Sequence, residues 1–491
     1  MALAATIVLP LLLGLLAAAL PSNRARPTLL PVAAACHLAA TLSAVFSWPF
    51  KSGGEGGLAL SWLGLDAPGK LVLLLVSVLF FCCSLYCVGY LRYRLERSNR
   101  VFVACLLGFL SAASLAAWSR HLGLTWVAIE ATTLSTAPLI YFNRSKRSIE
   151  ATWKYLLVCS VGIALALLGT FFLAYSAIAA GLPVSLMNDD LARAAAGLSR
   201  PWLRAAFVLI LVGYGTKMGL APMHTWKPDA YGEAPGVVGA IFAGGVTSCA
   251  FLAFLRVDRV CACAGEGAWS SRLLLVMGLF SMAIAALFMI AQRDFKRMLA
   301  YGSVEHAGIL AAALGFGGGA LGLGSGALYG GMLQLVAGGL AKGLLFLSAG
   351  NIHRAYASKS TDEARGAMRR LPLSGALFVA GFLATTGSPP FGPFIGLFSI
   401  LSSAVAGGRG LAAALFGLLL LAVFAGMGRT ALAVAQGRPP TEAAASSYRD
   451  GFLTTAPALI LLALVLLLGL WIPVPLESLM RDAASFMQAA P

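Results

Sequence analysis

The segment 215–236, GTKMGLAPMHTWKPDAYGEAPG, places Lys217 and a polar cluster directly after the apolar run AAFVLILVGY of residues 205–214. Pro222 follows Lys217 by five residues. Proline lacks an amide donor and its ring clashes with the preceding turn, so we expect the helix to break between these two residues. Broken helices persist in membranes only where protein or a water-filled cavity satisfies the freed backbone groups. The segment therefore predicts a polytopic membrane protein whose helix break lies at a functional site.

The composition agrees with this class. Of the 491 residues 59% are hydrophobic and only 11% are charged, and the mean hydropathy is +0.86. The net charge of +16 comes from short loops between apolar runs, which indicates topology signals rather than nucleic-acid binding. The cysteines lie mostly in apolar runs and resemble small buried hydrophobes, and CAC at 261–263 is too tightly spaced for an ordinary metal site. We expect the chain to contact the lipid bilayer, and we expect no nucleic-acid partner.

Apolar windows of about 20 residues predict an all-α fold with about 14 transmembrane helices. The predicted centres lie near residues 10, 38, 80, 109, 131, 167, 213, 246, 281, 308, 338, 383, 420 and 462. A second interruption, TTGSPPFGPFIGLF at 385–398, lies five spans after the first. An odd spacing inverts the repeated unit, so we expect two inverted five-helix repeats, each with a broken helix. The predicted divisions are 1–100 (helices 1–3), 101–260 (helices 4–8), 261–435 (helices 9–13) and 436–491 (helix 14 and tail).

Loop charge predicts the orientation. Loops after odd-numbered spans carry roughly twice as many Lys and Arg as the other loops, so we expect them to face the cytoplasm. Both termini are then outside.

Ionisable side chains inside predicted spans are costly, at about 2.5–3.5 kcal/mol for a Lys or Asp at a helix centre. Glu130 and Lys217 lie mid-span, Glu305 and His306 lie near the start of the tenth span, and Lys342 lies in the eleventh. They can form structural ion pairs or line a hydrated charge path, and their spread over four helices favours the path. Burial and a neighbouring carboxylate shift the pKa of a lysine in opposite directions, so a lysine whose carboxylate partner moves can take and release a proton. Glu130 is the natural partner for Lys217.

Two further features leave alternatives open. Gln334, Gly338 and Lys342 recur every four residues and share one helix face, where glycines provide either room for water or close helix packing. His306 is either a proton relay or a core histidine bonded to a carbonyl.

Three segments together resemble a known family. GTKMGLAPMHTWKPDAYGEAP (215–235) and DFKRMLAYGSVEHAGIL (294–310) are similar to the proton-conducting antiporter-like subunits of respiratory complex I and their relatives. LTWVAIEATTLSTAPLIYFNRSKRSIEATWKYLL (124–157) resembles one branch more closely, component F of hydrogenase-4. The resemblance covers roughly residues 70–435.

The resemblance implies roles for several residues. Glu130 and Lys217 match the family's carboxylate–lysine pair, and Lys342 matches its central relay. Lys154 falls where relatives keep a lysine, although Glu150 offers it an i,i+4 ion pair instead. The matching signature or gate residues are Pro222, His224, Asp229 and Glu233.

Several positions depart from the family pattern. Ser248, Gly338 and Leu397 stand where many relatives have a charged or titratable residue. Lys227 and Tyr231 stand where Leu and His are usual. The first half of the path therefore matches the family and the exit side does not, which leaves open whether the second half conducts.

The resemblance implies a non-catalytic, proton-translocating subunit of a redox-driven complex, of hydrogenase-4, formate hydrogenlyase or complex I type. Its expected partners are other membrane subunits and a peripheral hydrogenase-like or dehydrogenase-like arm, which would hold the nickel–iron and iron–sulfur centres. No cofactor is expected in this chain. The expected location is the cytoplasmic (inner) membrane of a bacterium or archaeon. The alternatives are a subunit of a multisubunit cation/proton antiporter or inorganic-carbon uptake system, or a non-conducting anchor.

Overall fold

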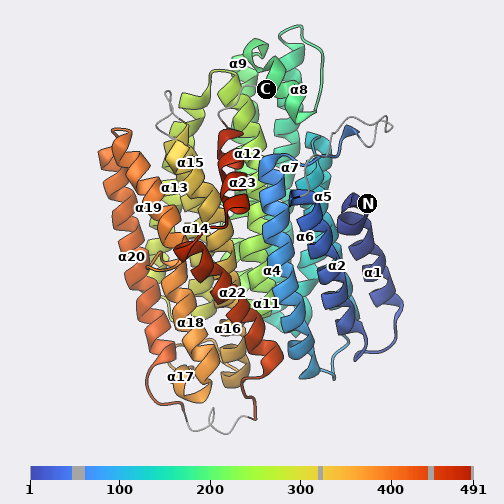
Figure 1. Cartoon of the computed structure of the whole chain (residues 1–491), viewed down its shortest axis with the longest axis vertical. Helices are drawn as coiled ribbons and strands as arrows, with labels where there is room; N and C mark the ends of the chain where they lie inside the picture. Colours follow the sequence, from blue (N-terminus) through green and yellow to red (C-terminus); the bar gives the residue numbers. More distant parts are fainter. Residues whose placement is uncertain (1, 47–60, 319–324, 441–446, 488–491) are drawn as a thin grey trace.

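The computed structural model describes residues 2–46, 61–318, 325–440 and 447–487, and these ranges are helical apart from loops and three isolated β-bridges. The predicted all-α class is confirmed, and the helices pack into one elongated bundle (Figure 1). The α-helices and three π-helical turns are η1 (Ala4–Val8), α1 (Leu9–Ala19), α2 (Leu29–Phe46), α4 (Ala67–Arg92), α5 (Arg100–Trp118), α6 (Leu122–Ile140), α7 (Lys146–Ile178), α8 (Asn188–Ala194), α9 (Arg200–Met218), α10 (Trp226–Glu233), α11 (Gly236–Ala240), η5 (Ile241–Val246), α12 (Thr247–Cys263), α13 (Gly267–Ile290), α14 (Phe295–Gly317), α15 (Ser325–Leu333), η6 (Gln334–Gly338), α16 (Gly339–Tyr356), α17 (Ala367–Arg370), α18 (Pro372–Thr385), α19 (Gly392–Ala406), α20 (Gly410–Ala435), α22 (Phe452–Leu470) and α23 (Val474–Ser485).

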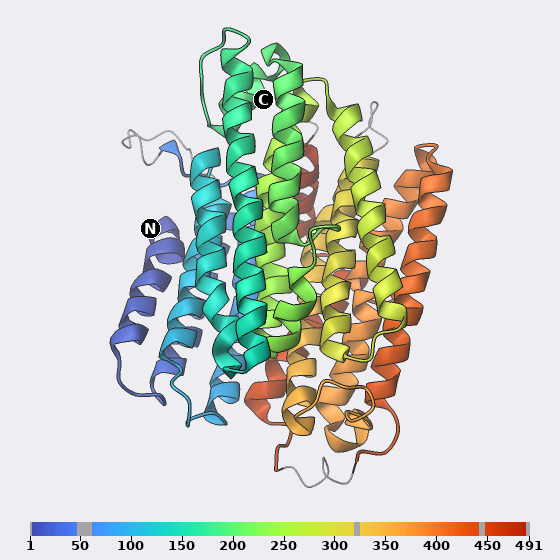
Figure 2. The same cartoon turned by 180° about the vertical axis from the view of Figure 1, so that it is seen from behind.

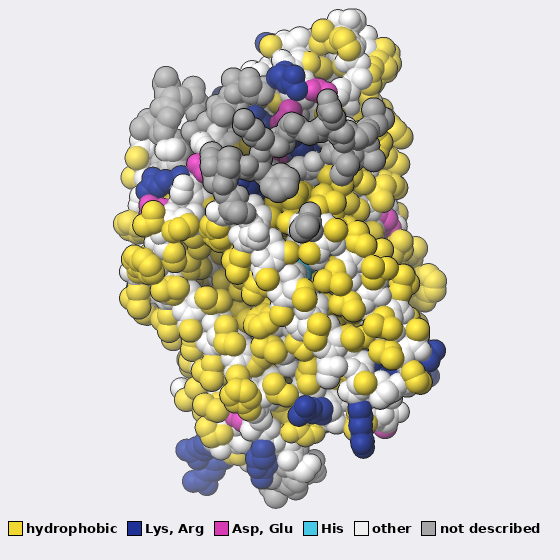
Figure 3. Space-filling view, turned by 45° about the vertical axis from the view of Figure 1, so that its right-hand side comes forward, with side chains coloured by type: hydrophobic (Ala, Val, Ile, Leu, Met, Phe, Trp, Pro, Cys, Tyr) yellow, Lys and Arg dark blue, Asp and Glu magenta, His cyan; other side chains and the backbone are white. Residues whose placement is uncertain are grey.

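Within the described ranges, ten helices are long and apolar enough to cross a membrane, and three shorter apolar helices accompany them. Every predicted centre falls inside a helix, whereas the count of about 14 spans and the inverted repeats stay predictions. On the face shown in Figure 3, hydrophobic side chains cover the middle of the molecule, and Lys and Arg appear toward its ends. The chain ends are both marked in the upper half of Figure 1, and the side of the membrane that they face stays a prediction.

Three helical segments form the centre of the bundle. They are Gly236–Cys263, Phe295–Gly317 and Ser325–Tyr356, whose apolar stretches are wholly buried, whereas those of α7, α13 and α20 are less than half buried. The first and third segments each contain a π-helical turn, a distortion that is frequent at functional sites. The buried polar residues of these segments are therefore shielded from lipid by the surrounding helices.

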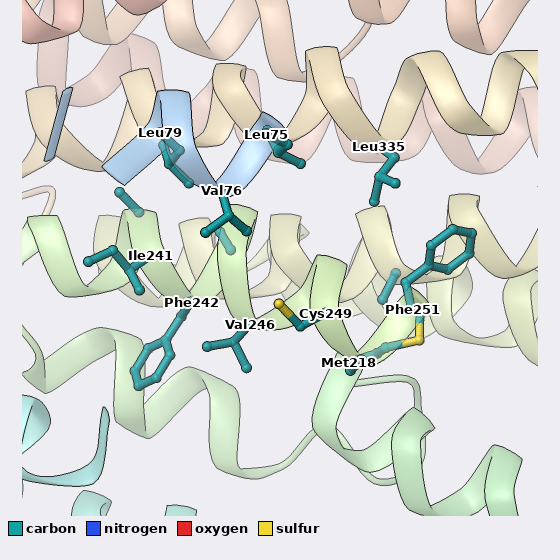
Figure 4. Close-up of a cluster of buried hydrophobic side chains, with 14 of the residues drawn as sticks. Leu75, Val76, Leu79, Met218, Ile241, Phe242, Val246, Cys249, Phe251 and Leu335 are labelled. Atoms are coloured by element: carbon teal, nitrogen blue, oxygen red, sulfur yellow. The ribbon is translucent and has the colours of Figure 1, made fainter. Parts of the chain in front are cut away.

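Helix α4 covers the first and third central segments by close contact. A Cβ at Gly244 or at Gly343 would lie 2.5 Å from a methyl carbon of Leu79, so any larger residue at either position requires the Leu79 side chain to shift. Figure 4 shows the resulting apolar layer, in which Leu75, Val76 and Leu79 of α4 lie beside side chains of η5 and α12.

Helices α7 and α9, seen from behind in Figure 2, also pack closely. A Cβ at Gly213 would lie 2.6 Å from the carbonyl oxygen of Gly162. Small residues at such a contact let two helix backbones approach, as is common within membranes. This contact brings the end of α9 against the middle of α7.

Both predicted helix breaks are confirmed. Between α9 and α10 the chain turns at Gly219, whose φ is +80°, and Pro222 lies in the connection. Between α18 and α19 the connection contains Gly387, with a φ of +74°, and Pro389 and Pro390. Glycine is the residue that adopts this left-handed conformation without strain.

Protein groups satisfy the backbone at the first break. The freed amide of Ala221 donates to Ser281 Oγ of α13 at 2.8 Å. The Trp226 indole donates to the carbonyl of Thr216 at 2.9 Å. The break is therefore held by protein partners, as the membrane setting requires.

Helix α14 begins earlier than the apolar pattern indicates. The Asp294 carboxylate accepts from the amides of Lys296 and Arg297 and caps the first turn. Glu305 and His306 therefore lie in the middle of the helix, and the expectation that they lie near its start was wrong. Both side chains are buried.

Candidate functional site

Glu130 of α6 and Lys217 of α9 meet through one hydroxyl group. Thr133 donates to Glu130 Oε2 at 3.0 Å and accepts a hydrogen bond from Lys217 Nζ at 2.8 Å. Both side chains lie in the described part of the chain and form no direct ion pair there, and the Thr133 hydroxyl joins them. Ser160 of α7 donates to the other carboxylate oxygen at 3.2 Å. A half-buried carboxylate is thus linked to an ammonium that is only 1% exposed.

Lys217 has a second hydroxyl partner on α7. Its ammonium donates to Tyr155 Oη at 2.7 Å and lies 4.7 Å from the centre of the same ring. Tyr155 shares a further 2.7 Å hydrogen bond with Thr136 of α6. The lysine is therefore held between α6 and α7 by groups that both accept and donate hydrogen bonds.

Lys154 lies outside this buried set. Its side chain is 47% exposed and forms ion pairs with Glu150 at 2.6 Å and Asp229 at 3.0 Å. Asp229 also pairs with Arg297 at 2.9 Å. Lys154 therefore pairs with its i,i+4 neighbour Glu150, in a surface cluster of charges that solvent and salt screen.

The other signature residues separate in space. Pro222 is exposed, whereas His224 is 8% exposed and its Nδ1 has no hydrogen-bond partner among the described residues. Glu233 accepts from Lys359 at 2.7 Å. Asp229 and Glu233 are therefore engaged in ion pairs near the surface, while His224 lies beside the helix break.

Lys342 of α16 and Glu305 of α14 form the second buried pair. Their charged atoms are 3.9 Å apart, and both side chains are almost fully buried. Glu305 Oε1, His306 Nε2 and Gln334 Oε1 have no hydrogen-bond partner among the described residues. Buried polar atoms are nearly always satisfied by protein or water, so three unpartnered atoms beside one ion pair mark this region as polar.

His306 fills the space beside Gly338. A Cβ at Gly338 would lie 2.6 Å from His306 Cε1 and 3.0 Å from Nδ1. The glycine therefore permits close packing of an imidazole that is supplied by α14. Of the two readings that the sequence left open for this glycine, close packing is the one observed.

The side of α14 beyond His306 is apolar. Leu397 is 6% exposed and belongs to a separate hydrophobic cluster between α14 and α19, whose other members include Ile309, Ala313, Phe316 and Ile400. The Ser248 hydroxyl, on α12, donates to the carbonyl of Gly244 within its own helix. Neither departure from the family pattern thus places a charge on the second half of the path.

Sequence reasoning did not include Lys227 among the site residues. This lysine on α10 is fully buried, and its ammonium donates to Ser303 Oγ of α14 at 2.8 Å. The signal that could have identified it is a lysine placed directly after a helix break within an apolar part of the chain.

Within the described ranges, no group of three or more His, Cys, Asp and Glu side chains is placed to hold a metal ion. The cysteines are free thiols, and most of them are buried, although Cys36 is exposed and Cys105 and Cys263 are half-buried.

The comparisons with known proteins agree on one family. The family model for NADH:quinone oxidoreductase/Mrp antiporter, TM, matches residues 119–426, more than half of the chain. The hydrogenase-4 component F homolog of Methylacidiphilum infernorum (isolate V4) is 35% identical over 364 residues, which are 72% of this chain and 75% of that protein.

Two solved structures share the fold. A chain of the Mrp complex from Dietzia sp. DQ12-45-1b has a TM-score of 0.83 at 22% identity and covers 99% of this chain and 97% of its own. A chain of respiratory complex I from Thermus thermophilus with bound Aureothin has a TM-score of 0.73 at 28% identity, with coverages of 96% and 98%. The chain therefore belongs to the NADH:quinone oxidoreductase/Mrp antiporter transmembrane family, and is an antiporter-like membrane subunit of the type found in complex I, group 4 hydrogenases and Mrp antiporters.

Proposed function

We propose that this subunit moves protons as part of a redox-driven complex of hydrogenase-4 type. The observation that carries the proposal is the hydrogen-bonded chain Lys217–Thr133–Glu130. The Thr133 hydroxyl accepts a proton from the ammonium while it passes its own proton to the carboxylate. The products are a neutral amine and a neutral carboxylic acid, so the charges of both groups disappear together. A charge change nearby can therefore shift the proton in either direction.

The Lys342–Glu305 pair supports the same function in the second half of the chain. Its atoms are 3.9 Å apart, which is longer than a hydrogen bond, so the pair is attracted without being locked. Because both groups are buried, each senses the charge of the other strongly. We infer that the two pairs alternate between charged and neutral states during transport.

The proposal includes the surroundings of the subunit. The partners are other membrane subunits and a peripheral hydrogenase-like or dehydrogenase-like arm, and that arm holds the nickel–iron and iron–sulfur centres. The complex lies in the cytoplasmic membrane of a bacterium or archaeon, with both termini of this chain outside. The 35% identity to the hydrogenase-4 component F homolog supports this choice among the complexes of the family.

The test is transport by the intact complex. The chain carries an affinity tag in its native host, and the co-purified complex is reconstituted into liposomes and supplied with its electron donor. We expect acidification of the lumen that a protonophore abolishes and that does not require sodium. Redox turnover without acidification, or acidification that depends on sodium, contradicts proton translocation.

A second candidate is a subunit of a multisubunit cation/proton antiporter, which the fold shared with a chain of the Mrp complex supports. A third is a non-conducting anchor, which the apolar cluster around Leu397 supports. The proteins that co-purify distinguish a cation/proton antiporter from a redox complex, because an antiporter brings no redox centres. Absence of flux in a redox-active complex identifies the anchor.

A further inference from the structure

Lys227 has unusual surroundings for a buried cation. Its side chain is fully buried, and its ammonium donates to Ser303 Oγ at 2.8 Å, to the Ser303 carbonyl at 3.3 Å and to Thr247 Oγ1 at 3.4 Å. These partners are hydroxyl and carbonyl oxygens, and none of the carboxylates in the described ranges forms an ion pair with it. An unpaired ammonium in an apolar bundle is costly, and releasing its proton removes that cost.

The helix break provides the space for this lysine. A Cβ at Gly219 would lie 2.2 Å from Lys227 Cε and 2.8 Å from Nζ. The ammonium also lies 5.9 Å from the centre of the Trp226 ring and 5.8 Å from that of Tyr231, where the rings stabilise its charged form. The site is therefore built to accept the cation although it provides no counter-charge.

Residues next to Lys227 and next to its partner Ser303 contact both buried pairs. On one side, Trp226 contacts Tyr155 with ring centres 4.9 Å apart, and Tyr155 accepts from Lys217. On the other side, its partner Ser303 follows Gly302, where a Cβ would lie 3.7 Å from Lys342 Nζ. Lys217 is thus linked to the chain neighbour of Lys227 through Tyr155, and Lys342 lies beside the residue that precedes Ser303.

We propose that Lys227 is the central proton carrier that couples the Lys217–Glu130 pair to the Lys342–Glu305 pair. The inference rests on the proposed function of proton translocation. In the transfer step the Lys227 N–H bond breaks, the Ser303 hydroxyl takes that proton and passes its own toward the neutral amine of Lys342. Lys227 becomes a neutral amine and Lys342 becomes an ammonium. Repulsion between two buried ammonium groups favours the state in which the two lysines share one proton.

The test uses three variants of the intact complex in liposomes. Lys227→Met keeps the length of the side chain but carries no proton, and Lys227→Arg keeps a charge that is not released. Ser303→Ala removes the shortest hydrogen bond and leaves the lysine. The matched control is Lys296→Met, because Lys296 is also fully buried on the α10–α14 contact but donates only to the carbonyls of Gly232 and Ala234.

We expect Lys227→Met and Lys227→Arg to lower coupled proton flux by on the order of 10²-fold, as for loss of a positioned acid–base group. Redox turnover measured with a protonophore should stay at the control level, and Lys296→Met should lower thermal stability without a matching loss of coupling. Wild-type flux in either assembled Lys227 variant overturns the proposal. If neither assembles, Ser303→Ala decides, because unchanged flux there shows a purely structural lysine. Absence of flux in the wild-type complex instead refutes the proposed function itself.

Discussion

At the scale of single residues, the buried lysines of the first half and the centre are held by hydroxyl groups. Lys217 donates to Thr133 and Tyr155, and Lys227 donates to Ser303. A carboxylate in direct contact accepts hydrogen bonds only, whereas a hydroxyl accepts one proton while it donates another. Hydroxyl partners therefore satisfy the ammonium and at the same time offer an exit for its proton.

Thr133→Val removes the hydroxyl that joins Glu130 to Lys217 and preserves the shape of the side chain. We expect proton flux to fall by on the order of 10²-fold, as for loss of a positioned proton-transfer group. Thr133→Ser should restore most of the flux. The matched control is Thr152→Val, because Thr152 of α7 donates only to the carbonyl of Ser148 in its own helix. Liposome acidification measures all three variants, and equal flux in Thr133→Val and Thr152→Val contradicts the bridge.

Lys217→Ala should leave assembly of the complex largely intact and remove ion pumping. The residue contacts α6 and α7 through two hydrogen bonds, whose loss costs little beside the packing of the bundle. Lys146→Ala, at the exposed start of α7, serves as the control for loss of a lysine. The assay is acidification of inverted vesicles that contain the variant complex. If the Lys217 variant acidifies them at the wild-type rate, Lys217 is not on the path.

At the scale of helices, the break between α9 and α10 does two things. It ends α9 directly after Lys217, and it turns the chain so that α10 directs Lys227 toward α14. Gly219 is required twice, because its φ is +80° and because Lys227 occupies the space that a side chain would need. The break and the central lysine are therefore one structural unit.

A comparison of Gly219→Ala with Gly265→Ala separates the need for a positive φ at Gly219 from the need for the space that Lys227 occupies. Both glycines have a positive φ, +80° and +77°, but no atom lies within 4 Å of a Cβ at Gly265. Each substitution costs about 1–2 kcal/mol for the left-handed backbone. Only Gly219→Ala also displaces Lys227, so we expect a larger drop in the melting temperature of the purified complex and a loss of flux. Equal melting temperatures and intact flux in both variants contradict the claim that the helix break and Lys227 form one structural unit.

At the scale of the whole molecule, polar groups are distributed unevenly along the bundle. Polar groups are found at the Glu130–Lys217 pair, at Lys227 and at the set formed by Lys342, Glu305 and His306. Beyond His306, the contact between α14 and α19 is an apolar cluster that contains Leu397. A proton that reaches His306 therefore needs a route other than this cluster, or the second half is closed.

Two variants separate these readings. If His306 is a relay, His306→Ala should lower proton flux while the redox turnover of the partner stays measurable, because an imidazole nitrogen can accept and release a proton and a methyl group cannot. Liposome acidification and electron-donor oxidation are measured on the same sample. Unchanged flux in His306→Ala, together with new flux created by Leu397→Lys, shows that the native second half is closed and that the subunit is an anchor.

The sequence by itself determined the all-α membrane class, both helix breaks and three of the buried charges, Lys217, Glu305 and Lys342, because apolar runs, proline and costly charges act locally along the chain. It did not determine which hydroxyl joins Glu130 to Lys217, nor that the Gly338 space holds an imidazole from α14. In the sequence Lys227 is only a departure from the family motif, whereas the structure shows its hydrogen bond to Ser303. Only the tertiary structure decided these points, since each depends on contacts between helices that are distant in sequence. Periodicity fixes the face on which a residue lies but not the group that this face meets.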